Sequence, residues 1–188
     1  MYKFVKNFNL KKYFIQYQPF LLFLGKFFLA YLMLTFIYQF YLSSVGNSID
    51  AITENVARLT EDTAHFFDVK ITTVKDYLHY NIVYHDQVAA RIIEGCNAIS
   101  VIILYISFVI AFSGKLKQTV LFITAGSLFI YVLNVLRIVV LSVLMYYYPA
   151  QEHLLHGVIF PLIIYGAVFV LWVIWVTKFS KYATKVTK

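Results

Sequence analysis

Three places in this sequence carry side chains whose types can do covalent chemistry. Cys96 is the only cysteine of the chain, and it lies where a polar, charged segment gives way to a long apolar run. Arg137 lies inside a later apolar stretch, and His153 and His156 open the last one. A cysteine thiolate is a nucleophile that a neighbouring cation or imidazole favours. Histidine transfers protons near neutral pH, and arginine donates fixed hydrogen bonds to a developing oxyanion. The combination predicts a cysteine-dependent catalytic site.

Two more polar residues accompany these groups, and each group also has a plainer explanation. Glu94 precedes the cysteine by two positions, and Asn134 lies one helical turn before Arg137, which it can orient by a hydrogen bond. A lone cysteine in an apolar segment is usually a small buried hydrophobe, and an arginine near a helix end extends its charge to the lipid headgroups. Histidines at a membrane boundary can be merely interfacial polar residues. What favours chemistry is that all these residues can meet at one depth.

The composition indicates a membrane protein. The chain has 188 residues, of which 61% are hydrophobic and only 13% charged, and its mean hydropathy is +0.74. So few charges cannot cover the surface of a water-soluble globule of this size. A single cysteine excludes an intramolecular disulfide and a zinc site of the CxxC type. We expect no metal, no organic cofactor and no nucleic-acid partner.

The apolar runs predict a single all-α integral membrane domain. A membrane-spanning helix needs ~20 mostly apolar residues, and the chain offers about four such helices, at 19–42, 94–113, 119–147 and 153–177. Basic tails at 1–18 and 178–188 flank them, and an outer loop occupies 43–93. In that loop the spacing of Ile52, Val56 and Leu59 predicts an amphipathic helix, and 69–83 is either a second helix or a short pair of strands.

The charge distribution predicts the orientation of these helices. Both tails and the turn at 113–118 carry lysines and no acidic residue, whereas every acidic residue lies in 50–94 or at Glu152. The positive-inside rule then places both termini and that turn in the cytoplasm, with the long loop and the turn at 148–152 outside.

This topology brings the reactive residues to one level. Cys96 begins the second span at the outer side, and His153 and His156 begin the fourth from the same side. Arg137 is 18 residues beyond Thr119, so a rise of ~1.5 Å per residue places it ~27 Å up, near the outer face.

These stretches resemble the exosortase/archaeosortase family of membrane transpeptidases. The resemblance extends over about 89–175 and comprises a Glu-x-Cys segment (Glu94, Cys96), an Asn-x-x-Arg segment (Asn134, Arg137) and a histidine segment opening the last helix. The small size and the ending at 165–175 look most like the exosortase F group.

By position, the resemblance implies that Cys96 is the nucleophile, Arg137 the transition-state stabiliser and a histidine the proton carrier. His153 and His156 both match a histidine pattern, and at i, i+3 they lie on one helix face. The chain departs from the family at Asn97-Ala98, because relatives often have a small residue and glycine after the cysteine. Many relatives also have more spans.

The resemblance further implies a partner and a location. The substrate would be a secreted protein with a C-terminal sorting tail, made of a short motif, one transmembrane helix and a basic end. The acceptor would be water or an amine, such as that of a surface glycan or lipid, and the chain would lie in a bacterial inner membrane with its site on the periplasmic side. Two other classes stay open: a non-enzymatic membrane scaffold or assembly subunit, and a small transporter component with Arg137 as an anion site.

Overall fold

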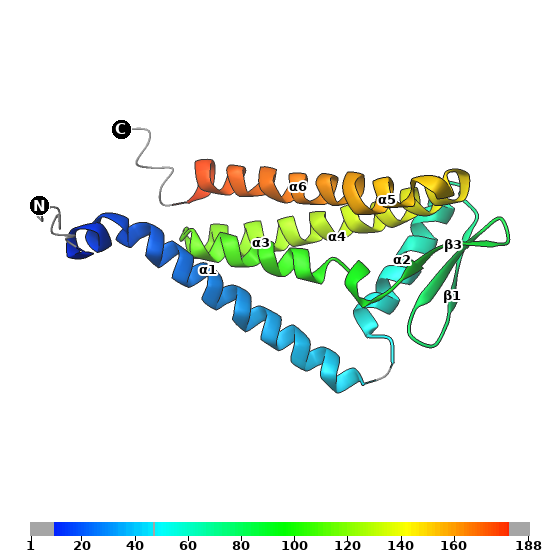
Figure 1. Cartoon of the computed structure of the whole chain (residues 1–188), viewed down its shortest axis with the longest axis horizontal. Coiled ribbons are helices and arrows are strands. Elements are labelled where there is room, and N and C mark those ends of the chain that lie inside the picture. The colour runs from blue at the N-terminus through cyan, green and yellow to red at the C-terminus, as the bar shows by residue number, and fades with distance from the viewer. Residues whose placement is uncertain (1–9, 47, 181–188) are drawn as a thin grey trace, which may run out of the picture.

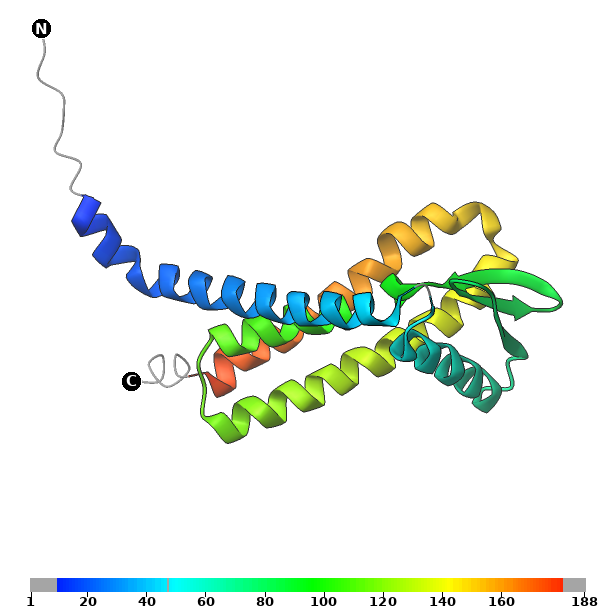
Figure 2. The ribbon, with the colours of Figure 1, turned by 90° about the horizontal axis from the view of Figure 1, so that it is seen from below.

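The computed structural model describes residues 10–46 and 48–180. Most of the two basic tails predicted at 1–18 and 178–188 lies outside these residues. The long apolar helices are α1 (Leu10–Val45), α3 (Ile99–Ala111), α4 (Leu116–Tyr147) and α6 (Phe160–Ile174). Helices α3, α4 and α6 lie side by side, α1 leans across α3, and a smaller unit sits at the far end of α4 (Figures 1 and 2).

Three of the apolar helical segments are long enough to cross a membrane: 15–45, 116–147 and 149–179. The fourth, α3, has 13 residues, which at ~1.5 Å per residue span ~20 Å of a hydrocarbon core of ~30 Å. It begins at Ile99 because the first residues of the span predicted at 94–113 form a 3-10 turn, η1 (Glu94–Cys96), and a bend. The chain is thus a mostly helical, membrane-embedded protein.

The expectation of an all-α chain is wrong for the loop at 43–93. This loop folds into α2 (Ala51–Phe66), β1 (Ile71–Lys75), β2 (Tyr80–Tyr84) and β3 (Gln87–Ile92), and the strands form an antiparallel sheet in the order β1-β2-β3. The predicted amphipathic helix is confirmed as α2, and of the two alternatives for 69–83 the strand pair is the one observed. The β-branched residues and a two-residue turn of positive φ, His85-Asp86 (48° and 60°), account for the hairpin.

The loop unit is attached to α4 by an apolar core of its own. This core joins α2, the sheet and α4 through Val56, Ala57, Ala64, Ile71, Ile82, Ile92, Ile138 and Val139. Asp50 caps α2, since its carboxylate accepts hydrogen bonds from the backbone of Ile52 and Thr53 at 3.0 Å each. The sheet is therefore fixed beside the part of α4 that carries Arg137.

A second core holds α3, α4 and α6 together at the other end. Tyr105 on α3 is fully buried and donates a 2.7 Å hydrogen bond to the carbonyl of Phe122 on α4. Gly126 makes room for it, because a Cβ there would lie 2.1 Å from the tyrosine hydroxyl. Trp175 is also fully buried, and its Nε1 donates to the carbonyl of Phe112 at 3.1 Å.

The basic and acidic parts of the chain lie at opposite ends of the molecule. Gly114, in the basic turn between α3 and α4, forms an isolated antiparallel bridge with Ser180 near the C-terminus. Glu94, Glu152 and the acidic residues of 50–86 lie at the end where α2 and the sheet pack (Figure 1). The acidic residues thus all lie at the end opposite the lysine-bearing turn at 113–118.

Candidate active site

Cys96 lies in a bend between the sheet and the membrane helices. Strand β3 runs into η1, whose last residue is Cys96, and α3 starts three residues later. The backbone N–H of Cys96 donates to the carbonyl of Ile93 at 2.8 Å, and its carbonyl accepts from Nδ2 of Asn134 on α4 at 2.7 Å. Asn134 is only 2% exposed. Its amide therefore positions the cysteine, rather than Arg137 as the spacing suggested.

Asn97 supports the bend from below through a network that the sequence did not predict. The side chain is 1% exposed, and its Nδ2 donates to the hydroxyls of Tyr38 at 2.7 Å and Thr53 at 3.2 Å. Its Oδ1 accepts from the backbone of Ile99 at 3.1 Å, which caps the start of α3. Thr53 in turn donates to the carboxylate of Asp50. Helices α1, α2 and α3 are thus joined beneath Cys96. Two features of the sequence could have indicated this network: the spacing of Asp50 and Thr53, which is typical of a helix cap, and the asparagine next to the cysteine.

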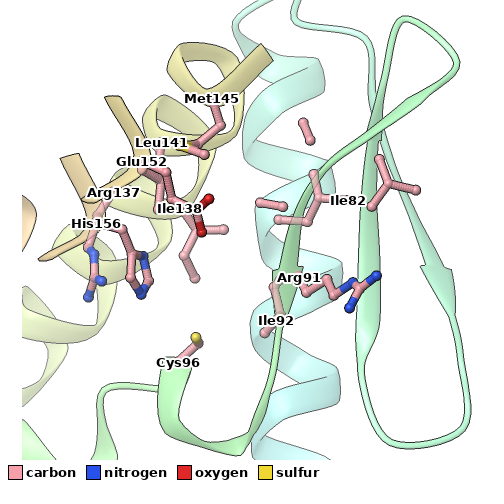
Figure 3. A pocket seen from close by; sticks show the side chains of 13 residues that line it. Ile82, Arg91, Ile92, Cys96, Arg137, Ile138, Leu141, Met145, Glu152 and His156 are labelled. Atoms are coloured by element: carbon pink, nitrogen blue, oxygen red, sulfur yellow. The ribbon is translucent and has the colours of Figure 1, made fainter. Parts of the chain in front are cut away.

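A cavity of about 440 Å³ opens above Cys96, between β3, α4 and the start of the last helix. Its walls comprise Ile82, Val88, Ala89, Ala90, Arg91, Ile92, Cys96, Arg137, Ile138, Leu141, Met145, Glu152 and His156. Three of the predicted site residues, Cys96, Arg137 and His156, therefore line one space. In Figure 3 the sulfur of Cys96 points up toward the side of the cavity that carries the His156 ring and the Arg137 guanidinium.

Arg137 brings to this cavity a positive charge that forms no ion pair with the described residues. Its Nε is buried and has no hydrogen-bond partner among the described residues, and no carboxylate lies within ion-pair distance of it in that part of the chain. A buried donor without a partner is costly. The guanidinium is therefore available to an anionic or carbonyl oxygen that enters the cavity.

The structure separates the two histidines. Both side chains are exposed, but His156 lines the cavity and His153 does not. Between them the helix changes from α5 (Glu152–Leu154) to a π-helical turn, η3 (Leu155–Ile159), so the face shared at i, i+3 in a regular α-helix is not kept. Such π-turns often occur at functional sites.

Glu94 lies outside the cavity walls and is exposed, so the structure gives it no direct contact with the site. Arg91 and Glu152 line the cavity although the sequence did not single them out; Glu152 approaches it from above His156, while the Arg91 guanidinium points toward the sheet (Figure 3). Within the described residues, no group of three or more His, Cys, Asp or Glu side chains could hold a metal ion.

The fold and the site together define a membrane-embedded protein with a cysteine, an arginine and a histidine around one cavity. The family model of the transmembrane exosortases matches residues 14–179, so the chain belongs to this family. No curated protein and no solved structure matches the chain. The family match confirms the resemblance drawn from the motifs, and family membership indicates a membrane transpeptidase for sorting signals.

Proposed function

We propose that this chain is a cysteine transpeptidase or protease of the exosortase F group that cleaves C-terminal sorting signals of secreted proteins. Its substrate is a precursor whose tail consists of a short motif, one transmembrane helix and a basic end. The transmembrane helix of that tail packs beside α3, α4 and α6, and the scissile bond lies in the cavity above Cys96.

The observation that carries this proposal is the convergence of Cys96, Arg137 and His156 on one cavity. The three come from η1, α4 and η3, which are far apart in the sequence. Packing alone gives no reason for a cysteine, an unpaired arginine and a histidine to share one space, whereas acyl transfer requires a nucleophile, an oxyanion donor and a proton carrier. The unpartnered Nε of Arg137 is the donor such a reaction needs.

In the first half of the reaction, the Cys96 thiolate attacks the carbonyl carbon of the scissile peptide bond. The carbonyl oxygen becomes an oxyanion that the Arg137 guanidinium stabilises by hydrogen bonding. The C–N bond then breaks, and protonated His156 gives its proton to the leaving amine. The products are a thioester on Cys96 and the released transmembrane tail.

In the second half, an amine of a surface glycan or lipid, or water, attacks the thioester carbonyl. Neutral His156 takes the proton of the attacking group, and the sulfur of Cys96 leaves as thiolate. Asn134 and Asn97 act as positioning residues throughout, because they hold the carbonyl of Cys96 and the backbone that follows it.

We further propose that the chain lies in the bacterial inner membrane with both termini cytoplasmic and the cavity on the periplasmic side. The positive-inside rule supports this orientation, because the lysine-bearing turn and the end of the last helix lie together, opposite the acidic unit. The scissile bond then lies on the periplasmic side of the membrane, the side to which secreted proteins are exported.

A comparison of secreted-protein C-termini tests the function directly. Strains that carry the wild-type chain or Cys96→Ala are compared by mass spectrometry of C-terminal peptides. We expect precursors with intact tails to accumulate only in the Cys96→Ala strain, with the variant present in the membrane at wild-type level. Normal processing in that strain would instead favour a non-enzymatic scaffold.

A further inference from the structure

The cavity above Cys96 extends along the edge strand β3 and also reaches Ile82 on the middle strand β2. Five consecutive residues of the strand, Val88–Ile92, line it. Side chains alternate between the two faces of a regular strand, but a β-bulge leaves Ala89 unpaired between Val88 and Ala90 and interrupts this alternation. Arg91 nevertheless lines the cavity while its guanidinium points away toward the sheet (Figure 3), so the cavity meets the part of Arg91 nearest the backbone, at the strand edge.

The direction of the backbone groups along this edge follows from the sheet register. The N–H of Thr73 on β1 donates to Glu61 at 3.0 Å, so Thr73 and its partner Ile82 are not a hydrogen-bonded pair. The backbone N–H and C=O of Ile82 must then point to β3, and the backbone N–H and C=O of the preceding residue, Asn81, must point to β1. Arg91 lies opposite Asn81, and its N–H and C=O therefore point away from β2, toward the cavity.

The hairpin at the other end of β3 leads to the same conclusion for Val88. A two-residue turn with positive φ closes on a hydrogen-bonded pair, which here is Tyr84 with Gln87. The next pair, Val83 with Val88, is then not hydrogen-bonded. Val88, like Arg91, directs its backbone groups outward.

These outward groups have no partner within residues 10–46 and 48–180, since their only neighbouring strand is β2. On β1, at the opposite edge of the sheet, the carboxylate of Glu61 accepts hydrogen bonds from both the N–H and the hydroxyl of Thr73. Proteins usually cover or block such an edge, since unpaired backbone groups are a template for another strand. On β3, no side chain of the described residues covers the outward groups of Val88 and Arg91, and this edge faces the cavity.

We propose that β3 binds the substrate by strand addition: the precursor segment that holds the scissile bond lies extended along Val88–Ile92 as a fourth strand. This inference rests on the proposed function. The chain itself gives the reason for that occupant, because β3 leads through Ile93 into η1, and a peptide paired with it arrives at Cys96. At ~3.3 Å per residue, five strand residues accommodate about five extended residues of substrate.

This binding mode also predicts how the sorting motif is read. Main-chain hydrogen bonds to β3 supply affinity without regard to sequence, and pockets for alternate side chains supply specificity. The wall opposite β3 is formed by Ile138, Leu141 and Met145 of α4 (Figure 3). The substrate side chain that points to α4 is therefore apolar.

Proline substitution tests the strand addition, since proline lacks the N–H. Arg91→Pro removes one outward N–H donor, whereas Arg91→Ala removes only the side chain. Lys75→Pro makes the same change at the opposite edge of the sheet. Lys75 lies two residues after Thr73 on β1, so its backbone N–H also points outward. We expect Arg91→Pro to process the precursors that accumulate in a Cys96→Ala strain about 5- to 10-fold more slowly than Arg91→Ala, the effect of one hydrogen bond. Lys75→Pro should process them at the wild-type rate.

A cross-linking measurement keeps the inference testable if Arg91→Pro does not insert. The photo-reactive residue p-benzoylphenylalanine is placed at Val88 in the Cys96→Ala chain, and at exposed Val74 on β1 as control. We expect the uncleaved precursors to cross-link at Val88 and not at Val74. Equal processing by Arg91→Pro and Arg91→Ala, or precursors that do not cross-link at Val88, would overturn strand addition and leave the proposed function intact. If no precursors accumulate in the Cys96→Ala strain, both the strand addition and the proposed function are refuted.

Discussion

Replacing Arg137 by lysine separates catalysis from a structural role at this position. Both side chains carry a positive charge on a long stem, so an arginine that merely extends to lipid headgroups can be replaced by lysine with little effect. An arginine that stabilises an oxyanion cannot, because its planar fork presents fixed donors and the lysine ammonium is a single mobile point charge. The buried Nε favours the second role, since lysine has no group at that position.

The expected loss follows from the donors that disappear. The Arg137 side chain faces the cavity with no protein partner among the described residues, so it needs no rearrangement to meet an oxyanion. Removing one such preorganised donor typically costs ~2.7–4 kcal/mol, or about 100- to 1,000-fold in rate. We expect Arg137→Lys to fall in this range, and Arg137→Ala to fall lower, because the charge is then lost as well.

The assay follows the conversion of precursor to product in cells that express each variant at matched membrane levels. Lys26→Ala is the control: this lysine lies in α1 and donates a 3.3 Å hydrogen bond to Ser113 near the basic turn, at the opposite end of the molecule from the cavity. It should process normally. An Arg137→Lys chain that processes precursors at more than about a tenth of the wild-type rate would refute the oxyanion role.

Three further substitutions address the other residues of the site. Cys96→Ser should insert normally but lose processing, because a serine hydroxyl is hardly ionised without a dedicated base; measured cleavage in this variant contradicts the nucleophile. His156→Ala should slow processing by about 100- to 10,000-fold, whereas His153→Ala, which changes an exposed residue outside the cavity, should leave the rate unchanged; the reverse result would exchange their roles. Asn134→Ala should lower the free energy of unfolding by ~1–3 kcal/mol, because the carbonyl of Cys96 loses its partner; thermal denaturation in detergent measures this, and an unchanged midpoint would argue against the contact.

Much of the fold follows from hydropathy, because apolar runs in a membrane can form little besides helices. Helix α4 and the last helical segment coincide closely with the spans predicted at 119–147 and 153–177. Helix α3 is shorter than predicted, since hydropathy does not reveal where an apolar run stops being helical. The chain at 94–98, where the polar loop meets the apolar run, is held in η1 and a bend by side-chain contacts from distant elements.

The sheet was harder to predict than the helices. Residues 69–83 fit a helix or a strand pair by periodicity alone, and the third strand, β3, was not anticipated. Strand pairing depends on which segments meet, and here the register is set by the turn at His85-Asp86 and by burial of Ile82 and Ile92 against α4. Which of His153 and His156 lines the cavity could not be predicted from the sequence either, because it depends on the π-helical turn η3.

The departure at Asn97-Ala98 has a physical explanation in the bend that carries the nucleophile. Ala98 adopts φ 62°, a left-handed conformation that glycine enters freely and that costs other residues ~1–2 kcal/mol. Asn97 makes three side-chain hydrogen bonds in the buried network below, each contributing ~0.5–1.5 kcal/mol. These bonds together are sufficient to offset the strain at Ala98. Asn97 thus permits an alanine in the left-handed position that follows it, and the bend that carries Cys96 at the cavity is kept.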